Sequence, residues 1–466
     1  MSATLPHGSL VELGPQVREY DAGRILVGGA PPRLVRLGAR ALPLLKNRRI
    51  RLDDPSSVRL AERLLALGMA HPVTAELPPF DASQLTVVVP VRDRARELDR
   101  LLSAIGGGTQ VIVVDDGSYD PYAVVRVAAR HGARIVVLDV NRGPAAARNA
   151  GLRQVRTPYV AFVDSDVVLG PDALLDLLRH FHDPRLALVA PRVLGLDGSG
   201  GWAARYEAAR SSLDVGPEPA LVHPRSRVSW IPSACLVARV DALGHGFDEG
   251  LRVGEDVDLG WRLAGEGRRV RYDPSVTVRH DHRTRVTDWL ARKAYYGSGA
   301  HALAVRHGSA IAPAALTPWA AAVAAALLAQ RRWSVPVAAA VLATVCRGYA
   351  RDVTAGSADP RRLAVSLTGL GLAATAGQTS ALLLRHWWPL SAVGCLVSRR
   401  VRRATLVAAV VDGLLEHRRL APDLDPVRFV LARRLDDLAY GAGLWAGAVR
   451  GRSPRCLLPE IRGRVR

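Results

Sequence analysis

Between residues 85 and 163 the chain alternates short apolar runs with longer amphipathic stretches. The apolar runs are rich in β-branched residues and have the length of buried strands, whereas the stretches between them repeat apolar residues at helical spacing. Because strands that alternate with helices pair in parallel through right-handed crossovers, this pattern predicts an α/β domain with a mainly parallel, Rossmann-like sheet and helices on both faces. The expected strands are Leu85–Val91, Gln110–Val114, Arg134–Val140 and Tyr159–Val163, and the expected helices lie near Ala95–Ile105, Pro121–Arg130 and Pro144–Val155.

Residues 1–80 have a different pattern and are expected to form a small separate domain. Short apolar runs precede a stretch from Val58 to Leu67 whose leucines have helical spacing, and Pro78-Pro79 ends the segment as a linker. The segment has no D-x-D motif and no histidine cluster, so its expected role is to bind an acceptor or a partner protein. The alternative is a stabilising extension that packs on the sheet.

Beyond residue 296 the chain contains long uncharged runs. Ile311–Ala329 has 19 residues and Leu363–Leu384 has 22, and a 13-residue uncharged run follows each of them. Helices of the longer kind can cross a hydrocarbon core of about 30 Å. Arginine clusters near residues 347–362 and 399–403 would lie on the cytosolic side under the positive-inside rule. This pattern predicts a membrane-associated helical region over 297–398 and a basic helical tail over 399–466, and a buried alanine-rich bundle is the alternative.

Composition narrows the classes of protein that remain. The chain has 466 residues, 49% hydrophobic and 23% charged, which excludes an intrinsically disordered protein. Its net charge of +20 favours anionic partners such as nucleic acid, acidic lipid or phosphorylated substrates. The arginines are spread over the whole chain, and basic helices interleaved with aromatic residues are lacking, so no nucleic-acid partner is expected. Four widely separated cysteines favour neither a disulfide framework nor a zinc site, and the N-terminus lacks a signal-peptide pattern.

Acidic residues follow two of the expected strands at the point where each strand ends. Val113-Val114 runs into Asp115-Asp116-Gly117-Ser118, and Phe162-Val163 runs into Asp164-Ser165-Asp166. Ligands of open α/β sheets bind at the carboxyl ends of the strands, so these groups define a polar crevice. A D-x-D motif placed there can share Mg²⁺ or Mn²⁺ with the phosphates of a nucleotide. Taken alone, D-x-D is a common tripeptide, and D-D-G-S is equally typical of a plain turn.

Two further clusters lie nearer the end of the expected domain. Gly254-Glu255-Asp256-Val257-Asp258 opens a helical stretch, and a carboxylate there could take the proton from an acceptor hydroxyl. Arg279-His280-Asp281-His282-Arg283 could complete a metal site or hold phosphate. The alternatives are a negatively charged helix start stabilised by the helix dipole and histidines in a surface loop.

In this order the motifs resemble the family 2 glycosyltransferases of the GT-A fold, from Leu85 to about Arg285. The matching stretches are V-V-V-P-V-R-D-R, V-V-D-D-G-S, N-R-G-P-A-A-A-R-N-A-G, F-V-D-S-D and G-E-D-V-D-L-G-W-R-L. The resemblance implies an inverting enzyme that uses a nucleotide-diphosphate sugar and a divalent cation, Mg²⁺ or Mn²⁺. It also implies nucleotide-sugar contacts by Asp93, Asp116, Arg148 and Asp164, metal binding by Asp166 and His280, and a general base at Asp256.

Over the full length, the chain resembles the glycosyltransferases of mycofactocin biosynthesis. The stretch V-R-E-Y-D-A-G-R-I-L-V-G-G-A-P-P-R-L-V-R-L and the following L-A-E-R-L-L-A-L-G-M-A-H-P look like a small peptide-recognition domain with a winged-helix pattern. The resemblance implies UDP-glucose as the donor, a peptide-derived redox cofactor precursor as the acceptor, and extension of a short β-glucan. The apolar region predicts that the protein lies at the cytosolic face of the cell membrane.

One departure limits the resemblance to processive enzymes. The Q-x-x-R-W motif of polysaccharide synthases is absent, since Gln330-Arg331-Arg332-Trp333 is one residue too short and lies in an apolar region. The runner-up is a membrane transferase that builds a cell-wall polysaccharide or glycolipid. A purely structural membrane scaffold would leave the strand-end acidic clusters unexplained. The expected domains are therefore 1–80, a transferase domain over 81–296, the apolar region 297–398 and the tail 399–466.

Overall fold

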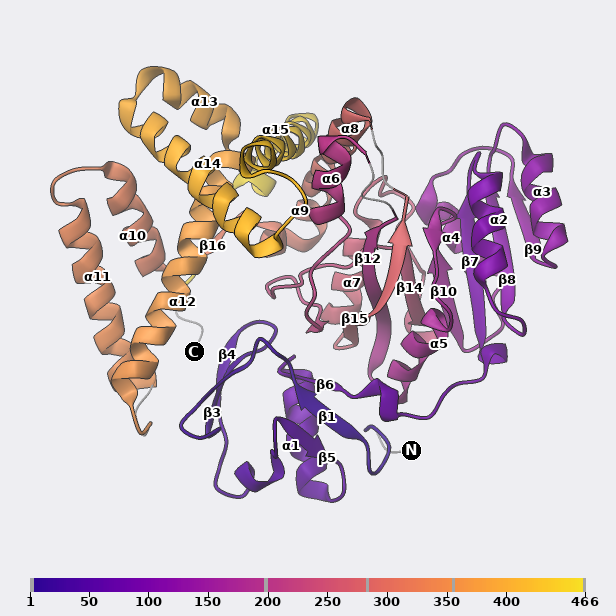
Figure 1. The fold of residues 1–466 in the computed structure, drawn as a ribbon, viewed down its shortest axis with the longest axis horizontal. Coiled ribbons are helices and arrows are strands. Elements are labelled where there is room, and N and C mark those ends of the chain that lie inside the picture. The colour runs from indigo at the N-terminus through magenta and orange to yellow at the C-terminus, as the bar shows by residue number, and fades with distance from the viewer. Residues whose placement is uncertain (1–3, 197–199, 282–284, 354–356, 464–466) are drawn as a thin grey trace. The chain divides into compact units, whose positions relative to one another are not determined.

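The computed structural model describes residues 4–196, 200–281, 285–353 and 357–463, and the chain folds into two compact units (Figure 1). The first unit comprises residues up to 198 together with 211–282, and the second comprises 199–210 together with 283–466. This division differs from the four expected domains. The N-terminal segment belongs to the same unit as the α/β sheet, and the apolar region belongs to the same unit as the basic tail.

A nine-stranded mixed sheet forms the body of the first unit. Its strand order is β11-β15-β12-β14-β10-β7-β8-β9, and β13 pairs with β15 outside this path. The four expected strands pair in parallel, as predicted. Strand β14 enters between β10 and β12 in the opposite direction, and β11 and β13 are antiparallel to β15. The sheet is therefore mixed rather than mainly parallel, because the alternation of strands and helices that predicts parallel pairing ends at β10.

The elements of this sheet lie close to the predicted residues, and two strands and one helix match them at both ends. Strand β8 runs two residues beyond its expected end, so Asp115 and Asp116 belong to the strand itself. The bounds are β7 (Leu85–Val91), α2 (Ala95–Ala104), β8 (Gln110–Asp116), α3 (Pro121–Arg130), β9 (Arg134–Leu138), α4 (Pro144–Leu152), β10 (Tyr159–Val163), β11 (Val167–Val168), α5 (Ala173–Leu178), β12 (Leu186–Gly195), β13 (Ala220–Leu221), β14 (Cys235–Arg239), α7 (Glu255–Gly265) and β15 (Arg269–His280).

Two hydrophobic cores lie on opposite faces of the sheet, as the buried apolar runs require. Val87 and Val89 pack with residues of α2, α3 and α5, whereas Val88 packs with residues of α4 and α7. Helix α4 lies so near the sheet that a Cβ on Gly151 would come within 2.3 Å of a Val88 methyl group. Glycine at this position therefore sets how closely α4, which carries Arg148, approaches the strands.

The N-terminal segment consists of two small antiparallel sheets and a helix. The predicted helix is present, and the side chain of Asp54 caps it by accepting hydrogen bonds from the N–H groups of Ser56 and Ser57. A winged helix combines strands with several helices, but the described residues 4–81 contain a single α-helix, so that expectation is not met. The bounds are β1 (Leu10–Leu13), β2 (Arg18–Tyr20), β3 (Ile25–Gly28), β4 (Arg33–Arg36), β5 (Arg49–Arg51), α1 (Pro55–Ala66) and β6 (Ala70–Pro72), with sheet orders β5-β1-β6 and β2-β3-β4.

Buried ion pairs join this segment to the nine-stranded sheet. Glu62 of α1 accepts a hydrogen bond from Arg269 at 2.7 Å, and Arg269 and Arg271 both donate to the buried Asp183 at 2.8 and 2.7 Å. Because breaking one member of such a network leaves an unpaired buried charge, the segment and the sheet stabilise each other.

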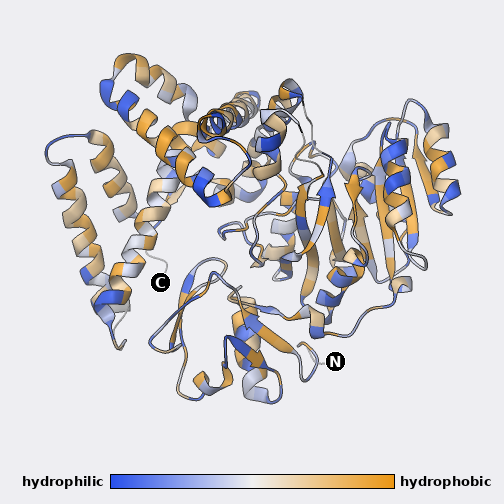
Figure 2. Cartoon of the chain, viewed as in Figure 1, coloured by the Kyte–Doolittle hydropathy of each residue, from blue (hydrophilic) through white to orange (hydrophobic). Residues whose placement is uncertain are grey.

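The second unit is helical. Its elements are α6 (Trp202–Ala209), α8 (Val286–Ser298), α9 (Ala300–His307), α10 (Pro318–Ala329), α11 (Ser334–Gly348), α12 (Pro360–Ala381), α13 (Trp388–Val397), α14 (Arg399–Leu420) and α15 (Pro426–Arg450), two π-helical turns (Tyr349–Val353 and Leu382–His386), and the short strands β16 (Ala315–Leu316) and β17 (Glu460–Ile461). Figure 2 shows that several of these helices, α13 among them, are largely apolar.

Only one of the two long uncharged runs forms a long helix. Within the described residues, Pro360–His386 is the helix with the length and composition to cross a membrane. The run Ile311–Ala329 forms a helix only from Pro318 onward. Its 12 residues span about 18 Å at 1.5 Å per residue, too short for a membrane core of about 30 Å. The expected crossing by this run is therefore wrong, because Pro313 and Pro318 interrupt it.

Candidate active site

The two carboxylates at the end of β8 organise the turns that follow the strand. Asp115 accepts hydrogen bonds from the N–H and the hydroxyl of Ser118 at 3.1 and 2.5 Å. Asp116 accepts from the N–H groups of Arg142 and Gly143 at 2.7 and 2.9 Å. The second oxygen of the buried Asp115 has no hydrogen-bond partner in the structure. Buried carboxylate oxygens are normally paired, so this atom indicates a place for a ligand group or water.

Asp93 connects the end of β7 to the same turn. Its side chain accepts a hydrogen bond from the N–H of Tyr119 at 2.7 Å, and its own N–H donates to the hydroxyl of Ser118 at 2.9 Å. Asp93 adopts φ +58°, a left-handed conformation that is strained for a residue with a side chain. The Tyr119 ring is exposed, with the Arg92 guanidinium 5.6 Å from its centre. The turn therefore presents an aromatic ring to solvent beside the strand ends.

Arg148 links the D-x-D motif to the acidic start of α7. It is 2% exposed, and it donates to Asp164 at 2.7 Å and to Glu255 at 3.0 Å. Burial by itself would lower the pKa of Arg148, but the charges of Asp164 and Glu255 outweigh burial and raise the pKa. The guanidinium also lies 5.4 Å from the ring centre of Phe247. Arg148 is thus a covered cation that positions two carboxylates.

Asp164, Asp166 and His280 form a candidate metal centre. One ligand atom from each lies within 4.8 Å of the others, and His280 Nε2 is 3.3 Å from Asp166 Oδ1. The pairing of β11 with β15 produces this arrangement, because Val167 is directly opposite His280. Two carboxylates and an imidazole are a donor set that Mn²⁺ accepts, and carboxylate oxygens also suit Mg²⁺, so these residues fit a divalent cation. The other oxygen of Asp166 pairs with the guanidinium of Arg94.

Asp256 lies on the first turn of α7, beside Glu255. Its carboxylate accepts hydrogen bonds from the N–H of Ser233 at 3.1 Å and from its neighbour Val257 at 2.8 Å. Burial and then the negative charge of Glu255 raise the pKa of Asp256 to about 7, against the lowering effect of these two N–H groups and of Arg148. Asp256 keeps part of its surface open to solvent. A carboxylate with a pKa near neutrality can accept a proton at physiological pH and release it again.

Comparisons with known proteins identify the family of the chain. A model of glycosyl transferase family 2 matches residues 86–232. The chain is 43% identical over 482 residues to the pre-mycofactocin glycosyltransferase of Mycobacterium tuberculosis (strain CDC 1551 / Oshkosh), over 99% of this chain and 100% of that protein. The chain belongs to the family of this relative, within glycosyl transferase family 2. It is therefore a nucleotide-sugar glycosyltransferase, and its sheet is that of the transferase domain.

Two other similarities of this transferase are more limited. The poly-beta-1,6-N-acetyl-D-glucosamine synthase of Staphylococcus aureus (strain COL) is 27% identical over 170 residues, which are 35% of this chain and 41% of that protein. A solved mannosyltransferase of Pyrobaculum calidifontis, in complex with GDP-Man and Mn²⁺, has a TM-score of 0.39 and 20% identity over 78% of this chain and 90% of that one. Because this TM-score is below 0.5, the family assignment rests on sequence.

The structure brings most of the sequence-derived site residues of the transferase to one edge of the sheet, in two groups. Asp164, Asp166 and His280 form one group with Arg148 and the start of α7, and Asp93 and Asp116 organise the turns after β7 and β8. His282 and Arg283, the rest of the basic motif, lie outside the described residues. Arg94 and Glu255 lie inside motifs that the sequence analysis quotes, but no role was predicted for either residue by itself. Tyr119 was missed, although it directly follows the D-D-G-S motif, which is the signal that could have identified it.

Proposed function

We propose that the transferase moves glucose from UDP-glucose to a pre-mycofactocin-type acceptor, a peptide-derived redox cofactor precursor, with inversion at the anomeric carbon. The observation that carries the acceptor is the full-length identity of 43% to a pre-mycofactocin glycosyltransferase. The observation that supports the inverting chemistry is Asp256, a carboxylate with a pKa of about 7 on the helix that Arg148 ties to the D-x-D motif.

In the proposed reaction, Asp256 accepts the proton of the acceptor hydroxyl as that oxygen attacks the anomeric carbon. The bond from this carbon to the diphosphate breaks at the same time, and nucleoside diphosphate leaves on the opposite face of the sugar. Asp166 and His280 would hold the divalent cation, which supplies positive charge to the leaving diphosphate. Asp164 would bind the ribose, with its carboxylate oriented by Arg148.

The turn residues are assigned to the nucleotide. Asp93 and Asp116 would line the pocket of the base, and Asp116 also fixes the backbone of Arg142 and Gly143. We add the exposed ring of Tyr119 as a stacking partner for the base, since aromatic faces stack on bases without regard to sequence. Arg148 is too deeply covered to touch the donor, so its proposed role is positioning.

The experiment is mass spectrometry of products after the purified transferase has been incubated with pre-mycofactocin and, separately, UDP-glucose, GDP-mannose or UDP-N-acetylglucosamine. We expect the acceptor to gain hexose units with UDP-glucose, a short β-linked series on longer incubation, and loss of transfer in EDTA. An α-linked product from an α-linked donor would contradict the inverting mechanism, and full activity in EDTA would contradict the metal.

A membrane transferase for cell-wall polysaccharide or glycolipid is the second candidate. The 27% identity to a poly-beta-1,6-N-acetyl-D-glucosamine synthase favours it over part of the transferase domain. Donor-dependent labelling of lipid or polymer in place of pre-mycofactocin would support it.

For either acceptor, we propose that the transferase works at the cytosolic face of the cell membrane, supported by the apolar helix Pro360–His386. Membrane fractionation tests this location. A full-length chain that stays soluble without detergent would favour the buried helical bundle instead.

The N-terminal segment is proposed to help bind the acceptor. Gln16, Gly29 and Gly68 of this segment line a pocket together with the loop 215–221. A chain cut near Pro78-Pro79 should keep hydrolysis of the sugar nucleotide better than transfer, because the proposed donor residues all lie beyond the cut. Equal loss of both activities in a folded chain would show a structural role.

A further inference from the structure

In the middle of helix α14 the two acidic residues lie on the inner side and the exposed residues are aliphatic. On the inner side, Asp412 accepts hydrogen bonds from Arg433 and Arg434 of α15 at 2.7 and 2.6 Å, and Glu416 pairs with Arg210 at 3.4 Å. Water-soluble helices normally place such residues on the surface and pack their aliphatic side chains inward. This arrangement is the reverse, so the outer face of α14 is suited to an apolar surrounding.

The outer face of α14 is an uninterrupted stripe with arginines at both ends. Its exposed residues recur in pairs along the helix, and the pairs in the middle are aliphatic. In chain order they are Arg399 and Arg400, Arg402 and Arg403, Leu406 and Val407, Val410 and Val411, Leu414 and Leu415, and Arg418 and Arg419. We call these twelve residues the α14 stripe.

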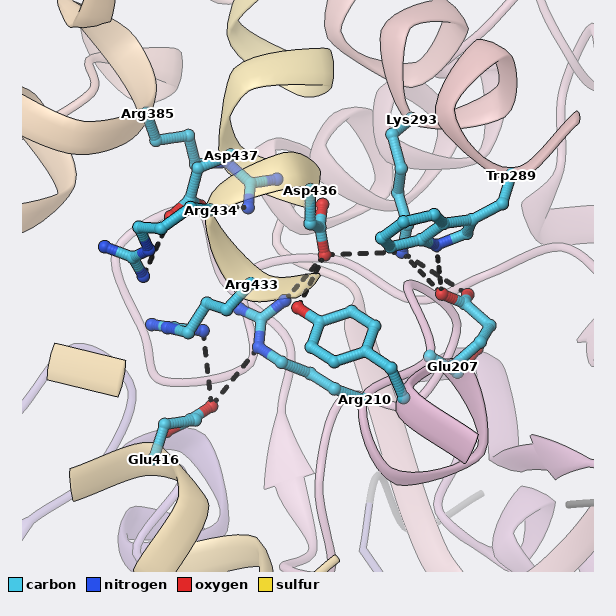
Figure 3. A network of polar contacts seen from close by, with 12 residues as sticks. Glu207, Arg210, Trp289, Lys293, Arg385, Glu416, Arg433, Arg434, Asp436 and Asp437 are labelled. Atoms are coloured by element: carbon cyan, nitrogen blue, oxygen red, sulfur yellow. Dashed lines mark hydrogen bonds and ion pairs between the residues drawn. The ribbon is translucent and has the colours of Figure 1, made fainter. Parts of the chain in front are cut away.

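The neighbouring helices have the same character. Leu431, Leu435 and Leu438 are exposed on α15, whose inner face carries the buried Asp436 and Asp437 (Figure 3). At the end of α13, Leu396 and Val397 are each 83% exposed, directly before the first arginines of the α14 stripe. Exposed aliphatic side chains therefore occur on three consecutive helices of one unit.

A second copy of the chain does not fit the α14 stripe. In a parallel pair, Arg402 and Arg403 would face their own counterparts, and in an antiparallel pair they would face Arg418 and Arg419. Both arrangements bring like charges together at each end, which is unfavourable. An anionic lipid surface has phosphate groups at its boundary and hydrocarbon below it. The phosphates complement the arginines at the ends of the α14 stripe, and the hydrocarbon complements its aliphatic middle.

We propose that the α14 stripe docks in the plane of an anionic lipid bilayer, with its aliphatic middle among the acyl chains and its arginines at the headgroup phosphates. The aliphatic part from Leu406 to Leu415 is about 15 Å long at 1.5 Å per residue, which is half of what a crossing needs. The α14 stripe therefore lies on the membrane and does not span it. This docking is independent of the sugar and the acceptor that the enzyme uses.

The test is flotation of the full-length protein with vesicles of phosphatidylcholine alone or mixed with phosphatidylglycerol. We expect binding to the anionic vesicles, weak binding to neutral ones, and release in 1 M salt, where the Debye length falls to about 3 Å. Arg399→Gln/Arg403→Gln should weaken binding about 25-fold, since each arginine contributes about 1 kcal/mol near such a surface. Leu406→Gln/Val410→Gln should weaken it by at least about tenfold.

Matched controls separate this inference from general effects of charge and apolar area. Arg96→Gln/Arg126→Gln removes the same charge from exposed positions of helices α2 and α3, and Val137→Gln/Val305→Gln removes exposed aliphatic side chains elsewhere. Both controls should bind vesicles like the parent protein. Vesicle binding that resists salt and is unchanged in the α14 stripe variants would overturn the proposal in favour of insertion by Pro360–His386. A dimer in solution that Leu406→Gln/Val410→Gln dissociates would overturn it in favour of a second copy.

Discussion

Each unit contains a cluster of buried charged side chains, and the two clusters differ in their ratio of acidic to basic residues. Among the described residues of the helical unit, five acids pair with five cations that are buried or partly buried, and Figure 3 labels most of them. These are Glu207, Asp412, Glu416, Asp436 and Asp437 with Arg210, Lys293, Arg385, Arg433 and Arg434. At the edge of the transferase sheet, Asp164, Asp166, Glu255 and Asp256 share Arg148 and Arg94, so negative charge is in excess.

Two carboxylates show what the difference does. Burial would raise the pKa of Asp436, but Lys293, Arg385 and Arg210 outweigh it and lower the pKa below its ordinary value. Burial also raises the pKa of Asp256, and the charge of Glu255 adds to it, so the pKa rises to about 7. In the helical unit, equal numbers of acidic and basic side chains stabilise the fold. At the sheet, the excess of acidic side chains can bind a cation or accept a proton during a reaction.

The largest expected effect follows from removing charge at the uncompensated cluster. Asp166→Asn keeps the size of the side chain but removes a proposed metal ligand, so turnover should fall by more than the roughly 10- to 100-fold typical of outer partners of a metal site. Release of nucleoside diphosphate measures it across a titration of Mn²⁺. Asp288→Asn, at an exposed position of α8, is the matched control and should leave turnover unchanged. Unchanged turnover in Asp166→Asn would refute the metal assignment.

Asp256→Asn should lower turnover by about 10²- to 10⁴-fold while nearly keeping the affinity for the sugar nucleotide. In the parent enzyme the base must be ionised, so kcat/KM should rise with pH and level off above about 7. The remaining activity of Asp256→Asn should lack this acid limb. If the variant keeps the acid limb, another group is the base.

Three of the transferase motifs could be placed from the sequence because each lies at the end of a short, strongly apolar strand. The buried runs Leu85–Val91 and Tyr159–Val163 determine where β7 and β10 end, and with them the positions of Asp93 and Asp164. Strand β14 was not predicted, because its place between β10 and β12 depends on pairing between distant segments. The helix in Ile311–Ala329 is shorter than its uncharged run suggests, because the prolines of the run prevent a helix before Pro318.

The sequence predicts which residues belong to the site better than it predicts which of them form hydrogen bonds with one another. Arg148 donates to Glu255, 107 positions away in the chain, and no local spacing encodes such a contact. For the same reason, the sequence does not predict that α14 and α15 turn charged residues toward each other and aliphatic residues toward solvent. Their charged residues look like the surface of a soluble helix until the structure shows that they pair with one another.

In the balanced cluster a single neutralisation should affect stability rather than chemistry. Lys293 is buried and lies 2.9 Å from Glu207 and 3.5 Å from Asp436. Lys293→Met removes the cation that both carboxylates share and should lower the free energy of unfolding by about 3 to 5 kcal/mol. Chemical denaturation measures it, and Lys46→Met, the exposed second lysine of the chain, is the control. The double variant Lys293→Met/Asp436→Asn should recover part of the lost free energy of unfolding. If Lys293→Met alone loses none, the charges of the network do not stabilise one another.

The smallest expected effect is a gain in stability at the active site. Because the pKa of Asp256 rises from an ordinary 3.8 to about 7 on folding, the folded protein binds more protons than the unfolded chain between these values. Stability contributed by this group is therefore present at low pH and is lost as the pH rises toward 7. Asn at this position does not titrate, so Asp256→Asn should melt at a higher temperature than the parent at pH 8. The difference should shrink toward pH 4, and thermal melts across this range measure it. A difference that does not change with pH would mean that Asp256 is not the uncompensated carboxylate that distinguishes this cluster from the balanced one.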